Sequence, residues 1–180
     1  MTATLRAPAS LLLKILRCLE ATRGKDYTRP AMCGVHIHAD GDAAVLVTSD
    51  GHALIRVMLP RQSQVPTDFQ GSLGETDIKV AMTLLKLAKE SEYDLVIPDM
   101  DLSTPFPPYT AVIPERKTET QSGVGVIGFM PELVARVFGA IAKLENRCVA
   151  ISVSKALDPI RLDIDTGDVQ VTAVIMPTHL

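Results

Sequence analysis

Apolar and polar residues alternate with a period of two over residues 169–176, near the end of the printed sequence. This period predicts a β-strand with one apolar face, and its other face is half apolar as well. The residues after it include Pro177 and Leu180, whereas most chain ends are polar. We therefore expect one wall of a groove here, with a plain core strand as the alternative. The residues concerned are Val174, Met176, Pro177 and Leu180.

The first part of the chain has the order strand, helix, strands. Residues 2–7 are predicted to form a strand, and a helix opens at residues 8–10, where a proline is tolerated because its missing N–H would have no partner. Apolar residues recur at helical spacing in this helix, and Gly24 is expected to cap its C-terminus. Turns rich in Asp and Gly then separate three predicted strands, at 32–38, 44–48 and 54–59.

This order returns twice, at a period of about 60 residues. Residues 61–76 are predicted to form a polar loop, and the second unit follows with a strand at 78–80, a helix at 82–90 with Leu84, Leu85 and Ala88 inward, and a strand at 93–97. Prolines predict an extended segment at 106–114. The third unit is predicted to have a strand at 124–128, a helix at 130–144, and strands at 149–153, 160–164 and 169–176.

Three weakly similar units, the middle one abbreviated, predict an α+β fold. Runs of short strands joined by tight turns favour antiparallel sheets with the helices on one face. We divide the chain into a domain of two units at 1–115, a linker at 116–123, and a half domain at 124–180.

The composition is that of a packed protein without a membrane span. Of the 180 residues 47% are hydrophobic and 22% charged, and no apolar run approaches the roughly 20 residues that cross a bilayer. No signal peptide is expected, because Lys14 and Arg17 interrupt the apolar run near the N-terminus. The cysteines, Cys18, Cys33 and Cys148, suit a reducing compartment, so a cytoplasmic location is expected.

The charge pattern points to a local basic surface. A formal net charge of −3 argues against binding nucleic acid through bulk charge, and an aromatic content of 4% disfavours base-stacking platforms. Each predicted helix nevertheless carries basic residues near one face, for which ordinary solvated faces are the alternative interpretation. If the helices lie side by side, they form one surface suited to phosphate contacts. Its members would be Lys14, Arg17, Lys86, Lys89, Arg136, Lys143 and Arg147.

Four stretches, in the same order, resemble the bacterial DNA sliding clamp, the beta subunit of the replicative DNA polymerase. Residues 8–21 resemble the opening helix of a clamp domain, and residues 32–35 and 45–54 resemble its strands and its "TDGHRL" turn. Residues 106–114 are similar to its "FPDYRRVLP" junction, and residues 174–180 to its C-terminal "VVMPMRL". Departures from these motifs fall at Ala53, Thr178 and His179.

The resemblance implies a ring with sheets outside and helices inside, which encircles duplex DNA without reading its sequence. Family members carry six units and this chain three, so a shortened version from a phage or mobile element is expected. A ring of about twelve units would need four copies, which makes a homotetramer the expectation and a dimer the alternative.

The resemblance also implies an apolar groove for short peptides of the DNA polymerase and the clamp loader, with no cofactor and no catalytic residue. Flexible methionines and a small turn would make an adaptable wall. The matching positions are Met32, Ser49, Gly51, His52, Leu54, Pro107, Val112, Val174, Met176, Pro177 and Leu180.

The sequence gives only weak support for a metal site, a phosphate-binding loop or a catalytic site. His36 and His38 share a strand face, but a metal site would need a third ligand nearby. The glycines of residues 123–128 lie within a predicted strand rather than between a strand and a helix, so a phosphate loop is disfavoured. No nucleophile–base set is visible. A non-enzymatic sliding clamp is therefore predicted; the alternatives are a clamp relative that binds partners or a host clamp without encircling DNA, and an enzyme with a small-molecule site.

Overall fold

The computed structural model describes residues 2–60, 65–89, 91–98, 105–115, 128–144, 148–153 and 158–178. The strands are β1 (Thr2–Pro8), β2 (Val35–Asp40), β3 (Ala43–Ser49), β4 (Ala53–Pro60), β5 (Gln70–Leu73), β6 (Glu92–Pro98), β7 (Ala150–Ser152), β8 (Ile160–Asp165) and β9 (Gln170–Ile175). The α-helices are α1 (Ala9–Leu19), α2 (Glu75–Ala88) and α3 (Pro131–Ile141), and the 3-10 turns are η1 (Pro30–Cys33), η2 (Tyr109–Val112) and η3 (Ala142–Leu144).

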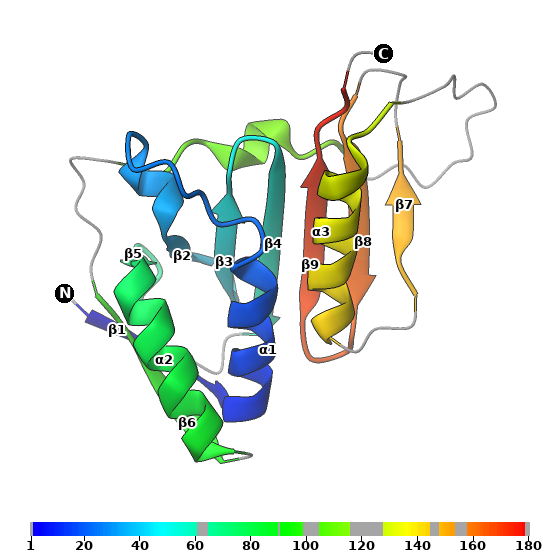
Figure 1. Cartoon of the computed structure of the whole chain (residues 1–180). Helices are drawn as coiled ribbons and strands as arrows, with labels where there is room; N and C mark the ends of the chain where they lie inside the picture. Colours follow the sequence, from blue (N-terminus) through cyan, green and yellow to red (C-terminus); the bar gives the residue numbers. More distant parts are fainter. Residues whose placement is uncertain are drawn as a thin grey trace.

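Seven of these strands form one antiparallel sheet, in the order β5-β2-β3-β4-β9-β8-β7 (Figure 1). Strands that are far apart in the sequence meet inside it, because β4 pairs with β9, with Ala53 opposite Ile175 and Met58 opposite Gln170. The other two described strands, β1 and β6, form a separate antiparallel pair. The first and third units therefore share one continuous sheet, and the predicted α+β class with antiparallel sheets is confirmed.

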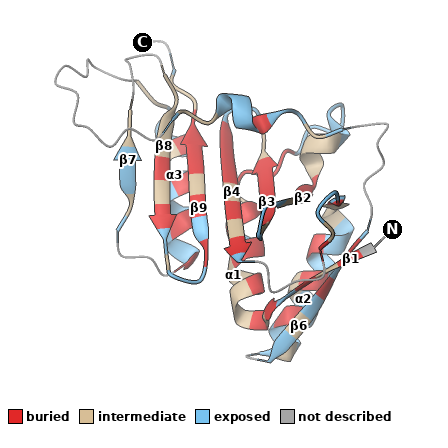
Figure 2. Cartoon of the chain, turned by 180° about the vertical axis from the view of Figure 1, so that it is seen from behind, coloured by how far each residue is buried: buried red, intermediate tan, exposed pale blue. Residues whose placement is uncertain are grey.

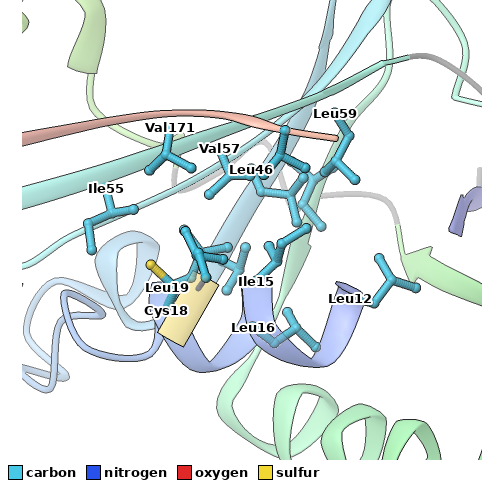
Figure 3. Packing of buried hydrophobic residues seen from close by; sticks show 14 of the residues in the cluster. Leu12, Ile15, Leu16, Cys18, Leu19, Leu46, Ile55, Val57, Leu59 and Val171 are labelled. Atoms are coloured by element: carbon cyan, nitrogen blue, oxygen red, sulfur yellow. The ribbon is translucent and has the colours of Figure 1, made fainter. Parts of the chain in front are cut away.

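The three α-helices lie on one side of the seven-stranded sheet (Figure 1). On α1 an apolar stripe is fully buried, as its spacing predicts, and it includes Leu12, Ile15, Leu16 and Leu19. Figure 3 shows this stripe packed under Leu46, Ile55, Val57, Leu59 and Val171, which come from β3, β4 and β9. Each such side chain contributes about 1.5–3 kcal/mol when fully buried, so α1 holds the β4–β9 junction together.

The opposite side of the sheet has its own small core. Residues on alternate positions of β3, Val45 and Val47, point away from the helices and pack with Leu54, Val174 and Tyr109. Tyr109 belongs to the segment 105–115, which thus lies across this face of the sheet. In Figure 2 the buried colour follows β3, β4 and β9, whereas β6 and β7 are largely exposed.

The sequence interpretation was wrong about the start of α2. Within the predicted loop at 61–76, the described residues 65–76 contain β5 and the first two residues of α2, and residues 78–80 are helical rather than a strand. The side chain of Asp77 accepts a hydrogen bond from the Gly74 N–H at 3.0 Å, which caps the helix N-terminus there. Leu84 is 44% exposed instead of inward, because the buried stripe of α2 consists of Ile78, Ala81 and Leu85.

Three further local predictions need correction. α1 ends at Leu19, so Gly24 does not cap it; Gly24 instead donates its N–H to the Met32 carbonyl, where a Cβ would lie 2.9 Å from that oxygen. Met32 lies in η1, so the predicted strand at 32–38 begins only at Val35. The segment 106–114, predicted as extended, contains the turn η2. Only Gly128 of the predicted strand at 124–128 lies within the described residues. The predicted linker at 116–123 lies entirely outside them.

Candidate partner-binding groove and helix face

The turn before β4 is built by its own polar side chains. One carboxylate oxygen of Asp50 accepts hydrogen bonds from the N–H groups of His52 and Ala53, both at 2.9 Å. The Ser49 hydroxyl accepts from the Gly51 N–H at 3.1 Å and donates to the Ala53 carbonyl at 3.0 Å. Gly51 has φ +90°, a conformation that side chains with a Cβ rarely adopt. This turn is therefore rigidly shaped by local sequence.

Two methionines meet this turn from distant parts of the chain. The Met176 N–H donates to the His52 carbonyl at 3.0 Å, which extends the β4–β9 pairing by one step. A Cβ placed on Gly51 would lie 3.9 Å from the Met32 terminal methyl, so Met32 lies beside the turn. The structure thus brings Met32, the turn and Met176 together.

A surface hollow of about 480 Å³ lies next to this junction. Val112, which is 40% exposed, lines it together with Met176. Its other lining residues are Ala111, Ile113, Pro114, Glu115, Asp158 and Pro159. The predicted residues Val112 and Met176, which are far apart in the sequence, thus share one apolar wall.

The remaining predicted groove residues have different positions. Leu54 and Val174 are buried at 2% and 0% exposure in the small core with Tyr109 and do not line the hollow beside Val112. Pro107 is exposed and does not line the hollow beside Val112 and Met176, whereas Pro177 is half-buried. Leu180 lies outside the described residues.

An aromatic cluster holds the segment 105–115 against β2. The ring of Phe106 stacks on His36 with 4.9 Å between centroids, and His36 stacks on His38 at 5.3 Å. The Tyr109 hydroxyl lies 3.1 Å from Nε2 of His38. Both histidines have a buried Nδ1 for which the described residues supply no hydrogen-bond partner. This cluster positions the segment that carries Val112 and the wall of the hollow.

Burial shifts the protonation of this cluster. Burial first, and repulsion from His38 second, together lower the pKa of His36 to about 4. Burial also lowers the pKa of His38, which Asp40 opposes. Near neutral pH both rings are therefore uncharged, which is the form that apolar stacking favours.

An arginine ties the other end of the segment to the sheet. Arg161 on β8 donates one N–H to the Pro114 carbonyl at 2.8 Å. Its Nε lies 2.8 Å and 3.0 Å from the two oxygens of Asp163, and Asp163 also accepts from the Thr172 hydroxyl. The hollow is thus framed by a half-buried polar network rather than by loose loops.

On the helix side, the predicted basic residues are only partly brought together. Arg17, Lys86, Lys89 and Lys143 are exposed, and Lys14 is half-buried. The Lys143 ammonium donates to the Arg17 carbonyl at 3.3 Å, which places α1 beside η3, the turn that follows α3. Arg147 lies outside the described residues.

Arg136 has a structural partner. Its guanidinium lies 2.6 Å from the second carboxylate oxygen of Asp50, so it ties α3 to the turn before β4. The two residues line a hollow of about 240 Å³ with His52, Met130, Glu132 and Leu133. Arg136 therefore braces the turn before β4, in addition to its predicted DNA-facing role.

Sequence reasoning missed residues whose roles depend on tertiary contact. The sequence analysis considered His36 and His38 only as a metal pair, and Phe106 and Tyr109 only as part of the segment 106–114. Their stacking needs β2 and the segment 105–115 to be adjacent. The alternation that places both histidines on one strand face was the available signal. Among the described residues, no cluster of three or more His, Cys, Asp or Glu could hold a metal ion, and no helix is long and apolar enough to cross a membrane.

Comparison with solved structures gives the fold. The chain is similar to the DNA polymerase III beta subunit of Thermotoga maritima, with a TM-score of 0.74, 15% identity, and coverage of 99% of this chain and 66% of that one. A DnaN sliding clamp of Bartonella birtlesii has a TM-score of 0.68 and 16% identity, with coverage of 99% of this chain and 66% of that one. The DNA polymerase sliding clamp of Bacillus subtilis has a TM-score of 0.72 and 12% identity, with coverage of 98% of this chain and 64% of that one. No protein-family model and no curated protein matches the chain.

These likenesses establish the sliding-clamp fold, which the sequence resemblance predicted. The chain spans just under two thirds of the length of each of these three proteins.

Proposed function

We propose that this protein is a DNA sliding clamp, a non-enzymatic processivity factor that encircles duplex DNA and tethers a polymerase. The β4–β9 pairing carries the proposal, because it joins units from distant parts of the chain into one sheet with all three α-helices on one side. A closed circle of such units would present helices inward and sheets outward. The likeness to solved bacterial clamps supports the same conclusion.

In this proposal four copies close the ring, and exposed cations on the helices make weak contacts with phosphates. We assign this role to Arg17, Lys86, Lys89 and Lys143, which are exposed. Weak, screened contacts suffice, because a closed ring is retained by topology rather than by affinity.

The double variant Arg17→Ala with Lys86→Ala tests the role of the helices. Its binding to a duplex should be weaker, and the slope of log K against log salt should fall by about 0.9 for each phosphate contact removed. The matched control is Arg6→Ala with Lys25→Ala, which removes the same charge from exposed positions outside the helices. Equal slopes for the two variants would argue against a DNA-facing helix side.

The hollow beside Val112 and Met176 supports a second part of the proposal, the docking of short apolar peptides from the polymerase or the clamp loader. Val112→Asp should abolish peptide binding measured by fluorescence anisotropy without changing DNA binding. Because one copy contains this whole hollow, a partner-binding protein that does not encircle DNA is the second candidate function. Peptide binding without retention on DNA would favour that candidate.

A further inference from the structure

A buried arginine lies just after the end of α1. Of the lysines and arginines that the structure describes, Arg23 alone is buried, at 6% exposure. Removing a guanidinium from water is costly unless its N–H groups find acceptors. A buried arginine therefore marks a place where the surrounding segments supply those acceptors and are held together by them.

The guanidinium of Arg23 contacts three segments. Its Nε and one terminal nitrogen each donate to a carboxylate oxygen of Glu20 at 2.8 Å, a two-pronged contact that fixes the plane of the group. The other terminal nitrogen donates to the Cys33 carbonyl at 3.0 Å and lies 3.8 Å from a carboxylate oxygen of Glu75. Glu20 directly follows α1, Cys33 ends η1, and Glu75 begins α2. Arg23 thus joins η1 to the ends of two helices.

These bonds also determine where Met32 lies. Gly24, next to Arg23, donates its N–H to the Met32 carbonyl at 2.9 Å, so two successive carbonyls of η1 accept bonds from this part of the chain. A 3-10 turn of four residues is not stable by itself, so its position depends on such contacts. The Met32 methyl then lies 3.9 Å from a Cβ placed on Gly51, in the turn before β4.

We propose that Arg23 is a positioning residue for the candidate groove, the junction where Met32 and Met176 meet the turn before β4. Arg23 fixes η1 against the ends of α1 and α2, and η1 in turn holds the Met32 side chain at the turn. A lysine does not replace it, because a guanidinium presents five N–H donors in one plane, whereas an ammonium is a point charge. The inference rests on the proposed docking of apolar peptides, and it adds a residue that acts through Met32 rather than by touching the peptide.

Two variants at this position separate geometry from charge. Arg23→Lys keeps the positive charge and loses the planar donor set, whereas Arg23→Leu loses both. In the full chain labelled with ¹³C at its methionine methyl groups, the NMR signal of Met32 is identified by its loss in Met32→Leu. This signal should shift in both arginine variants. Ile164→Ala, which removes a buried side chain from β8, is the control for a general loss of stability and should leave the signal in place.

Peptide affinity is the second readout. The probe is a fluorescein-labelled apolar peptide selected for binding to the unmodified chain. At a temperature at which every variant is folded, Arg23→Lys and Arg23→Leu should each raise its Kd about tenfold, because affinity falls with the fraction of molecules in which the wall is in place. Ile164→Ala should bind the probe as the unmodified chain does. If circular dichroism shows that Arg23→Leu is unfolded, Glu20→Gln replaces it, since this half-exposed carboxylate forms the same two-pronged contact.

Three results would overturn the inference: an unchanged Met32 signal in the arginine variants, an unchanged Kd in them, or an equal rise in Kd for Ile164→Ala. Full restoration by Arg23→Lys would also overturn it, because charge alone would then suffice. The Val112→Asp variant shows which proposal has failed. If this variant binds the probe normally, the proposed docking function fails and the role of Arg23 fails with it; if it loses the probe while the arginine variants keep it, the docking function stands and only the inference is wrong.

Discussion

The two histidines under the segment 105–115 show how single residues position the candidate groove. His36 lies flat between Phe106 and His38, and its Nδ1 is buried without a described partner. The groups that face this pair are Asp40 on the same strand, Arg56 on β4 and Tyr109 on the segment. Uncharged rings hold the segment in place, and a charged ring would have to lose its hydration.

Acidification should therefore loosen this protein. The pKa of His36 is about 4 in the folded chain against an ordinary value of 6.5, so the unfolded chain binds the proton more readily. The contribution of His36 to the free energy of unfolding should be largest above pH 6.5. It should fall by on the order of 3 kcal/mol as the pH decreases to 4 and below. Urea unfolding of the unmodified chain and of His36→Phe across this range should show a smaller fall in the variant. The exposed His52, changed to Phe, is the matched control.

Asp50 accepts hydrogen bonds from the turn before β4 and forms an ion pair with Arg136, and two variants should distinguish the contributions of these interactions. Asp50→Asn keeps an oxygen for the N–H groups of His52 and Ala53 but loses the ion pair with Arg136, whereas Asp50→Ala loses both. We expect Asp50→Asn to lower the free energy of unfolding by less than about 1 kcal/mol, and Asp50→Ala to lower it by about 1–3 kcal/mol. Chemical denaturation measures both, and equal costs would show that the turn does not depend on the carboxylate oxygen.

Among the elements, α1 packs its buried stripe against residues on both strands of the β4–β9 junction. Leu16→Ala should lower the free energy of unfolding by about 2–5 kcal/mol, since Leu16 is fully buried. The same change at Leu87, which is 74% exposed on α2, should cost less than about 0.5 kcal/mol in dilute solution. Similar losses at both positions would contradict the packing described here.

Elements with long, regular patterns could be predicted from the sequence, and those fixed by tertiary contact could not. Apolar residues alternate clearly in β3, β4, β8 and β9 and recur at helical spacing in α1 and α3. The predicted positions of these elements are confirmed within a few residues. The start of α2 was missed because Ile78 and Val80 are β-branched, and the capping contact of Asp77 outweighs that propensity. β5 was missed because its pairing with β2 depends on a fold that local sequence does not reveal.

For the whole molecule, the sliding-clamp fold could be predicted from four short motifs in order, and solved structures confirm it. The structure brings Met32 and Met176 to the turn at 49–52 and places Val112 and Met176 on one hollow, while a peptide groove at these residues stays a prediction. The roles of Leu54 and Val174 could not be judged beforehand, because their burial depends on how Tyr109 packs across the sheet. The partition into domains and the number of copies in the ring stay predictions.

Topological retention on DNA is the measurement that tests the central claim most directly. The protein is threaded onto a linear duplex, and both biotinylated ends are then blocked with streptavidin. At high salt the blocked duplex should keep the protein bound, and cutting the duplex between the blocks with a restriction enzyme should release it at once. Loss of the protein at the same rate from blocked and cut duplexes would show that it does not encircle DNA.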